Sequence, residues 1–207
     1  MENNIIIKPG SSSFSSAAAK LIYESSHELL NFMFKDQETA EKVLAKLYRK
    51  NKGHFSNVFS TVVEMEGEIV GLELGYDKGQ LAKQDLIGSI SLLLNSPFSI
   101  WWHLIAKTGR IIDGYVPKPS DRIYYINNIA VSDRCRGKGV GKKLLEYTIE
   151  KAKNNGYSAV ELDVTSVNEN AIGFYKKHGF VEVSKSGSQE LMTKYGLPPL
   201  IRMVHKL

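Results

Sequence analysis

The alternation of strand-like and helix-like segments over residues 124–183 constrains the fold of this chain more than any other feature. Apolar residues recur there with the period of a strand or of a helix. This order of elements predicts parallel strands joined by crossover helices. Ligands of such units bind at the carboxyl ends of the strands, near the helix N-termini. The expected elements are a strand over 124–131, a helix over 140–154, a strand over 160–164, a helix over 168–178 and a strand over 180–183.

The segment that joins the first of these strands to its helix has the composition of a phosphate-binding loop. Residues 132–143 read Ser-Asp-Arg-Cys-Arg-Gly-Lys-Gly-Val-Gly-Lys-Lys. Glycines at alternate positions let the backbone approach a ligand closely, and the helix start supplies unpaired N–H groups that attract an anion. The alternative interpretation is a tight turn followed by a solvated basic helix start. The basic side chains are Arg136, Lys138, Lys142 and Lys143.

Spacing excludes two common phosphate motifs. The dinucleotide-binding motif Gly-x-Gly-x-x-Gly requires glycine where Lys142 stands. In a Walker A motif, Arg136 would occupy the first glycine position and Lys143 would replace the hydroxyl residue. What remains is Arg-x-x-Gly-x-Gly, formed by Arg136, Gly139 and Gly141.

Together with three further segments, this loop resembles the GCN5-related N-acetyltransferase (GNAT) family. The segments are Asn-Ile-Ala-Val at 128–131, Asn-Glu-Asn-Ala at 168–171 and Phe-Tyr-Lys-Lys-His-Gly-Phe at 174–180. The first of them looks like the family's bulged fourth strand. The resemblance implies a mixed α/β fold, in which helices flank a central, splayed, mixed β-sheet of about six to seven strands.

We expect one N-acetyltransferase domain over residues 1–207. Its parts would be N-terminal helices with the first three strands (1–77), a helical insert on the acceptor side (78–122) and the acetyl-CoA-binding half (123–207). The remaining elements are strands over 5–7, 56–65, 68–76 and 200–206, a hairpin turn at Glu66-Gly67, and helices over 13–34 and from an N-cap at Asp36 to near Gly53.

The resemblance also implies acetyl-CoA, or coenzyme A, as cosubstrate and no metal. In the family's scheme the pantetheine arm pairs with the fourth strand, and a backbone N–H near Val131 polarises the thioester carbonyl. Asn168 bonds the pantetheine, positions Tyr175, or caps its own helix. The implied cofactor-binding residues are Ile129, Ala130, Val131, Arg136, Gly137, Lys138, Gly139, Val140, Gly141, Lys142, Asn168, Ala171 and Tyr175.

The implied reaction transfers an acetyl group to a primary amine of a small molecule, peptide or protein by direct attack through a tetrahedral intermediate. Tyr175 stands where the family often places its general acid, and a phenol with a pKa of about 10 is protonated at neutral pH. The alternative for Tyr175 is a half-buried helix aromatic.

The general base stays open, because the strand over 124–131 has no carboxylate. Glu73, on the third strand, is the first candidate, followed by Asp77 and Tyr125, although Glu73 could equally be a solvated residue of the sheet. A non-catalytic acyl-CoA sensor or regulatory module is the alternative function.

The insert contains a run of 21 residues, 86–106, that carries no formal charge if His103 is neutral. A single helix of that length, roughly 31 Å, would match a bilayer. Pro97 and the polar residues of the run instead predict two short amphipathic helices joined at 95–97. The pair Trp101-Trp102 fits a lid, an apolar acceptor pocket or a homodimer surface.

Composition favours no other class of partner. The net charge of +5, from 27 Lys and Arg against 22 Asp and Glu, is too small an excess to indicate nucleic acid. Cys135 is the sole cysteine, so we expect no disulfide and no thiolate metal site. The first four residues lack the start of a signal peptide, and we expect a cytoplasmic protein that does not bind membranes.

Overall fold

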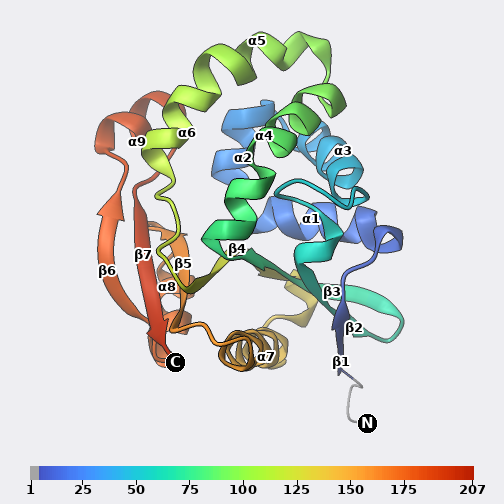
Figure 1. The fold of residues 1–207 in the computed structure, drawn as a ribbon, viewed down its shortest axis with the longest axis vertical. Helices are drawn as coiled ribbons and strands as arrows, with labels where there is room; N and C mark the ends of the chain where they lie inside the picture. Colours follow the sequence, from blue (N-terminus) through green and yellow to red (C-terminus); the bar gives the residue numbers. More distant parts are fainter. Residues whose placement is uncertain (1–4) are drawn as a thin grey trace.

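The computed structural model describes residues 5–207, apart from the side chains of Asp85 and Asp113. The first four residues, on which the signal-peptide expectation rests, lie outside the described residues. Within 5–207, seven strands form one sheet in the order β1-β2-β3-β4-β5-β7-β6 (Figure 1). The strands are β1 Ile5–Pro9, β2 Ser60–Met65, β3 Glu68–Tyr76, β4 Ile123–Val131, β5 Ala159–Thr165, β6 Val181–Ser186 and β7 Leu200–Lys206.

Helices cover both faces of this sheet, because side chains alternate between the faces along each strand. Leu72 and Leu74 pack with α1–α3 on one face, whereas Val63 and Met65 pack with α7 on the other. Figure 1 shows α7 beneath the sheet and α1–α3 above it, and α8 packs in one hydrophobic cluster with α7. The expected mixed sheet flanked by helices is confirmed. The helices are α1 Ser15–Ser25, α2 His27–Phe34, α3 Gln37–Tyr48, α7 Val140–Asn154 and α8 Glu169–Lys177.

The sheet is splayed between β4 and β5, its one parallel pair among the described strands. Their pairing runs from Ile123 opposite Ala159 to Ile126 opposite Leu162 and then stops. On its other side, β4 keeps pairing with β3 as far as Val131 opposite Gly71. The second half of β4 therefore has a strand neighbour on one edge only.

The insert consists of two helical segments, as the sequence predicts. The first, α4 (Lys78–Asn95), starts with a capping box between Asp77 and Gln80, and at 18 residues it is longer than expected. The chain breaks at Ser96-Pro97 and continues through a 3₁₀ turn, α5 (Trp101–His103), a π turn and α6 (Gly109–Tyr115). Figure 1 shows this second segment as an arch that ends beside α9 (Gln189–Tyr195). Among residues 5–207, no helix is both long enough and apolar enough to cross a membrane.

One expectation about helices is wrong, and one helix was not expected. The single helix predicted over 13–34 is divided at Ser26, whose φ of −149° and ψ of 38° are not helical. The amide of Asn128 in β4 donates to the hydroxyls of Ser25 and Ser26, at 2.8 and 3.1 Å, so a contact from the sheet stabilises the break. Helix α9 was not predicted, because a helix of seven residues shows little periodicity.

Gly75 in β3 provides a test of how tightly β3 and β4 pack. A Cβ atom at this position would lie 2.7 Å from the carbonyl oxygen of Tyr125 and 2.8 Å from the ring of Tyr124. We expect Gly75→Ala to lower the free energy of unfolding by about 1–3 kcal/mol in urea titrations, because the backbone of β4 must shift. Gly114→Ala in α6 is the control, since nothing lies within 4 Å of its Cβ position, and a similar loss there would contradict the steric explanation.

Candidate active site

A cleft of about 1900 Å³ runs along the molecule where β4 and β5 separate. One end is lined by the loop before α7 and by α8, and the other by α2, α4, α6 and the end of the insert. The splayed pair of strands forms the floor between them. The predicted cofactor loop and the insert thus face the same continuous space.

The loop before α7 presents its backbone to this cleft. Gly137 and Gly139 have φ values of 74° and 78°, a left-handed conformation that other residues rarely adopt. Gly139 is the N-cap of α7, and nothing lies within 4 Å of the Cβ position of either glycine. Open space, a helix N-terminus and the side chains of Arg136 and Lys142 make this end of the cleft suitable for a phosphate group.

Val140 and Lys138 belong to this loop but do not line the cleft. Val140 is fully buried and packs with Leu144 and Cys135 beneath the sheet, so only its backbone can serve a ligand. Lys138 is exposed and does not line the cleft. Gly141 does line it.

The open edge of β4 lines the middle of the cleft. Ile129, Ala130 and Val131 are half-buried there, and each pairs with β3 on its other side. Because β5 pairs with β4 only as far as Leu162, an extended ligand has room to lie along this edge.

Helix α8 places Tyr175 and Asn168 against the cleft. Burial raises the pKa of the Tyr175 phenol far above its ordinary value of 10. No residue in the described part of the chain forms a hydrogen bond with its hydroxyl. The side chain of Asn168 accepts a hydrogen bond from the backbone N–H of Ala171 at 3.1 Å, so Asn168 acts as the N-cap of α8.

Glu73, the first candidate for the general base, does not line the cleft. Its neighbours Leu72 and Leu74 face α1–α3, so its own side chain points to the α7 face of the sheet. There it is fully buried, accepts a hydrogen bond from Tyr124 at 2.7 Å and lies 3.5 Å from Lys151 Nζ. Asp77, the second candidate, caps α4 and accepts a hydrogen bond from Tyr157.

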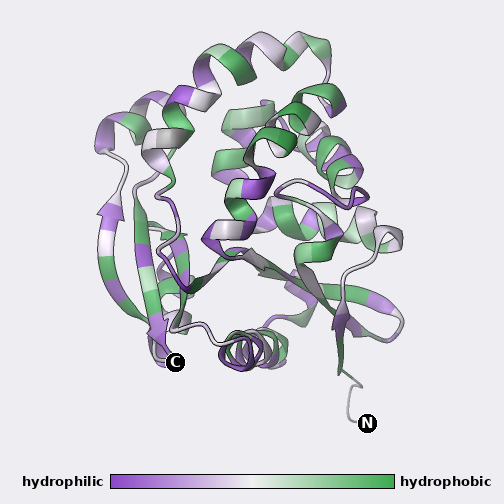
Figure 2. Cartoon of the chain, in the orientation of Figure 1, coloured by the Kyte–Doolittle hydropathy of each residue, from purple (hydrophilic) through white to green (hydrophobic). Residues whose placement is uncertain are grey.

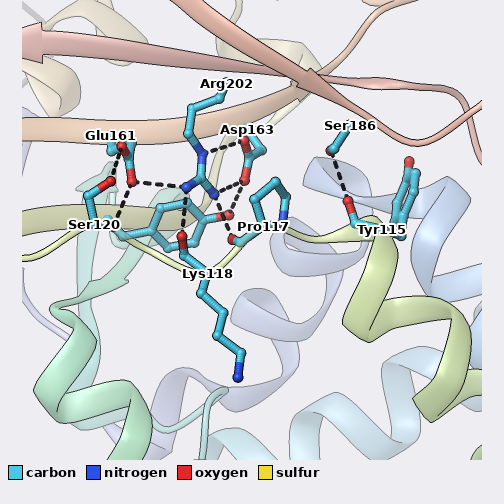
Figure 3. Close-up of polar contacts among 9 residues, drawn as sticks. Tyr115, Pro117, Lys118, Ser120, Glu161, Asp163, Ser186 and Arg202 are labelled. Atoms are coloured by element: carbon cyan, nitrogen blue, oxygen red, sulfur yellow. Dashed lines mark hydrogen bonds and ion pairs between the residues drawn. The ribbon is translucent and has the colours of Figure 1, made fainter.

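Tyr125, the third candidate, lines the cleft and joins a buried polar cluster whose members Asp163, Glu161 and Arg202 are labelled in Figure 3. Its hydroxyl donates to Asp163 Oδ2 at 2.9 Å. Burial, followed by the nearby Asp163, raises the pKa of Tyr125 well above 10. Arg202 binds Asp163 with two hydrogen bonds, at 2.9 and 2.6 Å, and also binds Glu161 at 3.2 Å.

Four acidic residues that line the cleft were not expected as site residues: Asp163, Glu24, Glu28 and Glu146. Asp163 sits between the buried residues Leu162 and Val164, directly opposite Arg202 in β7. An acid between two apolar residues of a strand can be noticed in the sequence. Its partner Arg202, however, lies 39 residues away. Burial raises the pKa of Glu24. Across 5–207, the described side chains include no group of three or more residues suited to hold a metal ion.

The family model described as "Acetyltransferase (GNAT) family" matches residues 23–180 of this chain. The chain belongs to the GNAT family. Mycothiol acetyltransferase of Jonesia denitrificans is 28% identical over 117 residues, which cover 53% of this GNAT chain and 36% of that relative. Streptothricin acetyltransferase A of Bacillus subtilis is 43% identical over 56 residues, which cover 27% and 32% of the two chains. The GNAT chain thus spans about a third of the length of these two relatives.

Solved structures share the fold of this GNAT protein over nearly its full length. An N-acetyltransferase from Staphylococcus aureus Mu50 has a TM-score of 0.72 at 20% identity, with 96% of this chain and 99% of that chain covered. The NatC complex bound to Gag peptide and CoA contains a chain with a TM-score of 0.55 at 14% identity, with 99% of each chain covered. At identities of 20% and 14%, these similarities show the shared fold alone.

The position of Glu73 leads to a prediction about stability and pH. Burial raises the pKa of Glu73 above its ordinary value of 4.5, and Lys151 and Tyr124 oppose this shift only in part. The folded state therefore binds this proton more tightly than the unfolded state, and the ionised carboxyl lowers stability once the pH rises above about 4.5.

We expect Glu73→Gln to raise the free energy of unfolding by about 1 kcal/mol at pH 7. The difference should vanish near pH 4, where Glu73 is protonated in both states. Urea titrations of both proteins at the two pH values measure it. A loss of stability at pH 7 would mean that attraction to Lys151 outweighs the desolvation of the carboxylate.

Proposed function

We propose that this chain is an N-acetyltransferase that transfers an acetyl group from acetyl-CoA to a primary amine. The observation that carries the proposal is the left-handed pair Gly137 and Gly139, open to the cleft beside the unpaired edge of β4. A diphosphate and an extended pantetheine arm require these two features next to each other.

Binding of acetyl-CoA would depend mainly on the backbone. Successive N–H groups from Arg136 to Lys142 would hold the pyrophosphate, with help from the positive end of the α7 dipole. The pantetheine arm would hydrogen-bond along Ile129 to Val131 as an added strand. A backbone N–H near Val131 would hold the thioester carbonyl oxygen, and one such donor typically contributes about 3 kcal/mol to transition-state stabilisation.

Tyr175 would supply the proton that the leaving thiolate takes up. The new bond forms between the amine nitrogen and the acetyl carbon, while the bond from that carbon to sulfur breaks. Because the raised pKa keeps the phenol protonated at neutral pH, its proton is available for the sulfur. A hydroxyl that lacks a partner among the described residues is free to approach that atom.

Asp163 would accept the proton of the attacking amine, in place of Glu73. A carboxylate has about four acceptor positions. Arg202 and Tyr125 use three of them, one on Oδ1 and two on Oδ2, so one position on Oδ1 remains for the amine. Tyr125 would hold Asp163 in place and not act as the base, because its own pKa is too high for it to lose a proton at neutral pH.

Calorimetry with coenzyme A and release of free thiol from acetyl-CoA test the proposal together. We expect CoA to bind and thiol release to require an amine. Absence of CoA binding would contradict the proposal. Binding without turnover of any amine or peptide would favour the alternative of a non-catalytic acyl-CoA sensor.

Tyr175→Phe tests the proton donor. We expect kcat to fall about a hundredfold. The KM for acetyl-CoA should change little, because the phenyl ring keeps its contacts with Phe174 and Phe180. Phe174→Leu is a matched control on the same helix, and an equal fall in kcat there would indicate disturbed packing.

A further inference from the structure

We propose that the acceptor is an amine carried on an apolar body, which binds beneath the insert. This inference rests on the proposed function and adds the class of substrate. The relevant space is the end of the cleft beyond Asp163, away from the glycine loop.

The insert forms the roof of that space, and its inner surface is apolar. Figure 2 shows hydrophobic and hydrophilic residues mixed along α4 and the arch, so the two sides of these helices must be distinguished by their contacts. The hydrophobic side chains that line the cleft include Leu81, Leu92 and Leu93 of α4, and Leu104 and Ile112 of the second segment. The space beneath the roof is therefore lined mainly by hydrocarbon.

Aromatic rings and α2 complete the chamber. Tyr76 and Tyr125 line the floor, with ring centroids 6.2 Å apart. Leu30 and Met33 of α2 line the side. Rings and aliphatic side chains on three sides suit a planar or aliphatic group better than a hydrated one.

The roof is fixed at several points. Arg202 donates to the carbonyl oxygens of Pro117 and Lys118, at 2.7 and 2.8 Å, where the chain returns from the insert to β4 (Figure 3). His103 lies 2.6 Å from the carbonyl oxygen of Phe32, and Tyr115 donates to that of Pro198 at 2.5 Å. A chamber with fixed walls is formed before the ligand arrives, so binding orders few groups.

The described charged side chains that line this end are two carboxylates, Asp163 and Glu28, and three lysines, Lys52, Lys78 and Lys118. Asp163 binds Arg202, and Glu28 lies 3.5 Å from His27 Nδ1. One amine can use the remaining acceptor position of Asp163. Further ammonium groups of a polyamine would lie against the apolar roof and lose hydration without compensation.

Adjacent leucines of α4 provide a matched pair of variants. Leu93 lines the cleft, whereas Leu94 is 69% exposed on the outer side. We expect Leu93→Asp to lower kcat/KM for 2-phenylethylamine at least about tenfold. Leu94→Asp should leave it unchanged, and both variants should keep the wild-type KM for acetyl-CoA. Leu93→Ala, which adds no charge, should lower kcat/KM for this amine to a smaller extent.

The wild-type protein should acetylate 2-phenylethylamine and n-hexylamine at least about tenfold more efficiently, in kcat/KM, than spermine or glycinamide. Calorimetry of the same amines with the CoA-loaded protein measures their binding without turnover. A preference for spermine or glycinamide, or equal effects of Leu93→Asp and Leu94→Asp, would overturn the inference while acetyl transfer stands. Binding of the apolar amines without turnover would support the chamber and contradict the proposed function.

Discussion

The buried guanidinium of Arg202 is the interaction on which the shape of the cleft depends. It lies in β7, binds Asp163 and Glu161 of β5, and donates to two carbonyl oxygens where the insert returns to β4. A charge in this position is costly unless all of its donors are satisfied, and here four partners satisfy it. One side chain thus fixes β5, β7 and the end of the roof at the point where the sheet opens.

The sequence was sufficient to predict a glycine loop at the start of a helix, because that feature is local. Its glycines, basic residues and helix start follow one another within residues 136–142, and their conformation depends on short-range geometry. The acidic residues are different. Whether Glu73 or Asp163 reaches the cleft depends on the face of the sheet that each side chain occupies and on partners distant in the sequence. Neither the face nor the partners can be derived from one sequence.

The insert illustrates the same limit. Pro97 correctly predicts the break between the two helical segments, because the reason lies in proline itself. The sequence predicts one role for Trp101 and Trp102 together, but the two side chains have different surroundings in the structure. Trp101 donates to the carbonyl oxygen of Ser96 at 3.2 Å, while Trp102 is 79% exposed. The division of Ser15–Ser25 from His27–Phe34 was likewise not predictable, because its partner Asn128 lies in β4.

The irregular pairing of β4 changes which of its residues face each side of the sheet. Leu74 pairs with Asn128 and Gly75 with Ile126, so Asn127 is an extra residue without a partner in β3. Odd-numbered Tyr125 and even-numbered Asn128 consequently both face α1–α3. Before the extra residue the odd-numbered side chain faces α1–α3, and after it the even-numbered side chains do. Deleting it would remove the bulge and leave every later side chain of β4 on its present face, because Ile126 and Asn128 would then be neighbours in regular alternation.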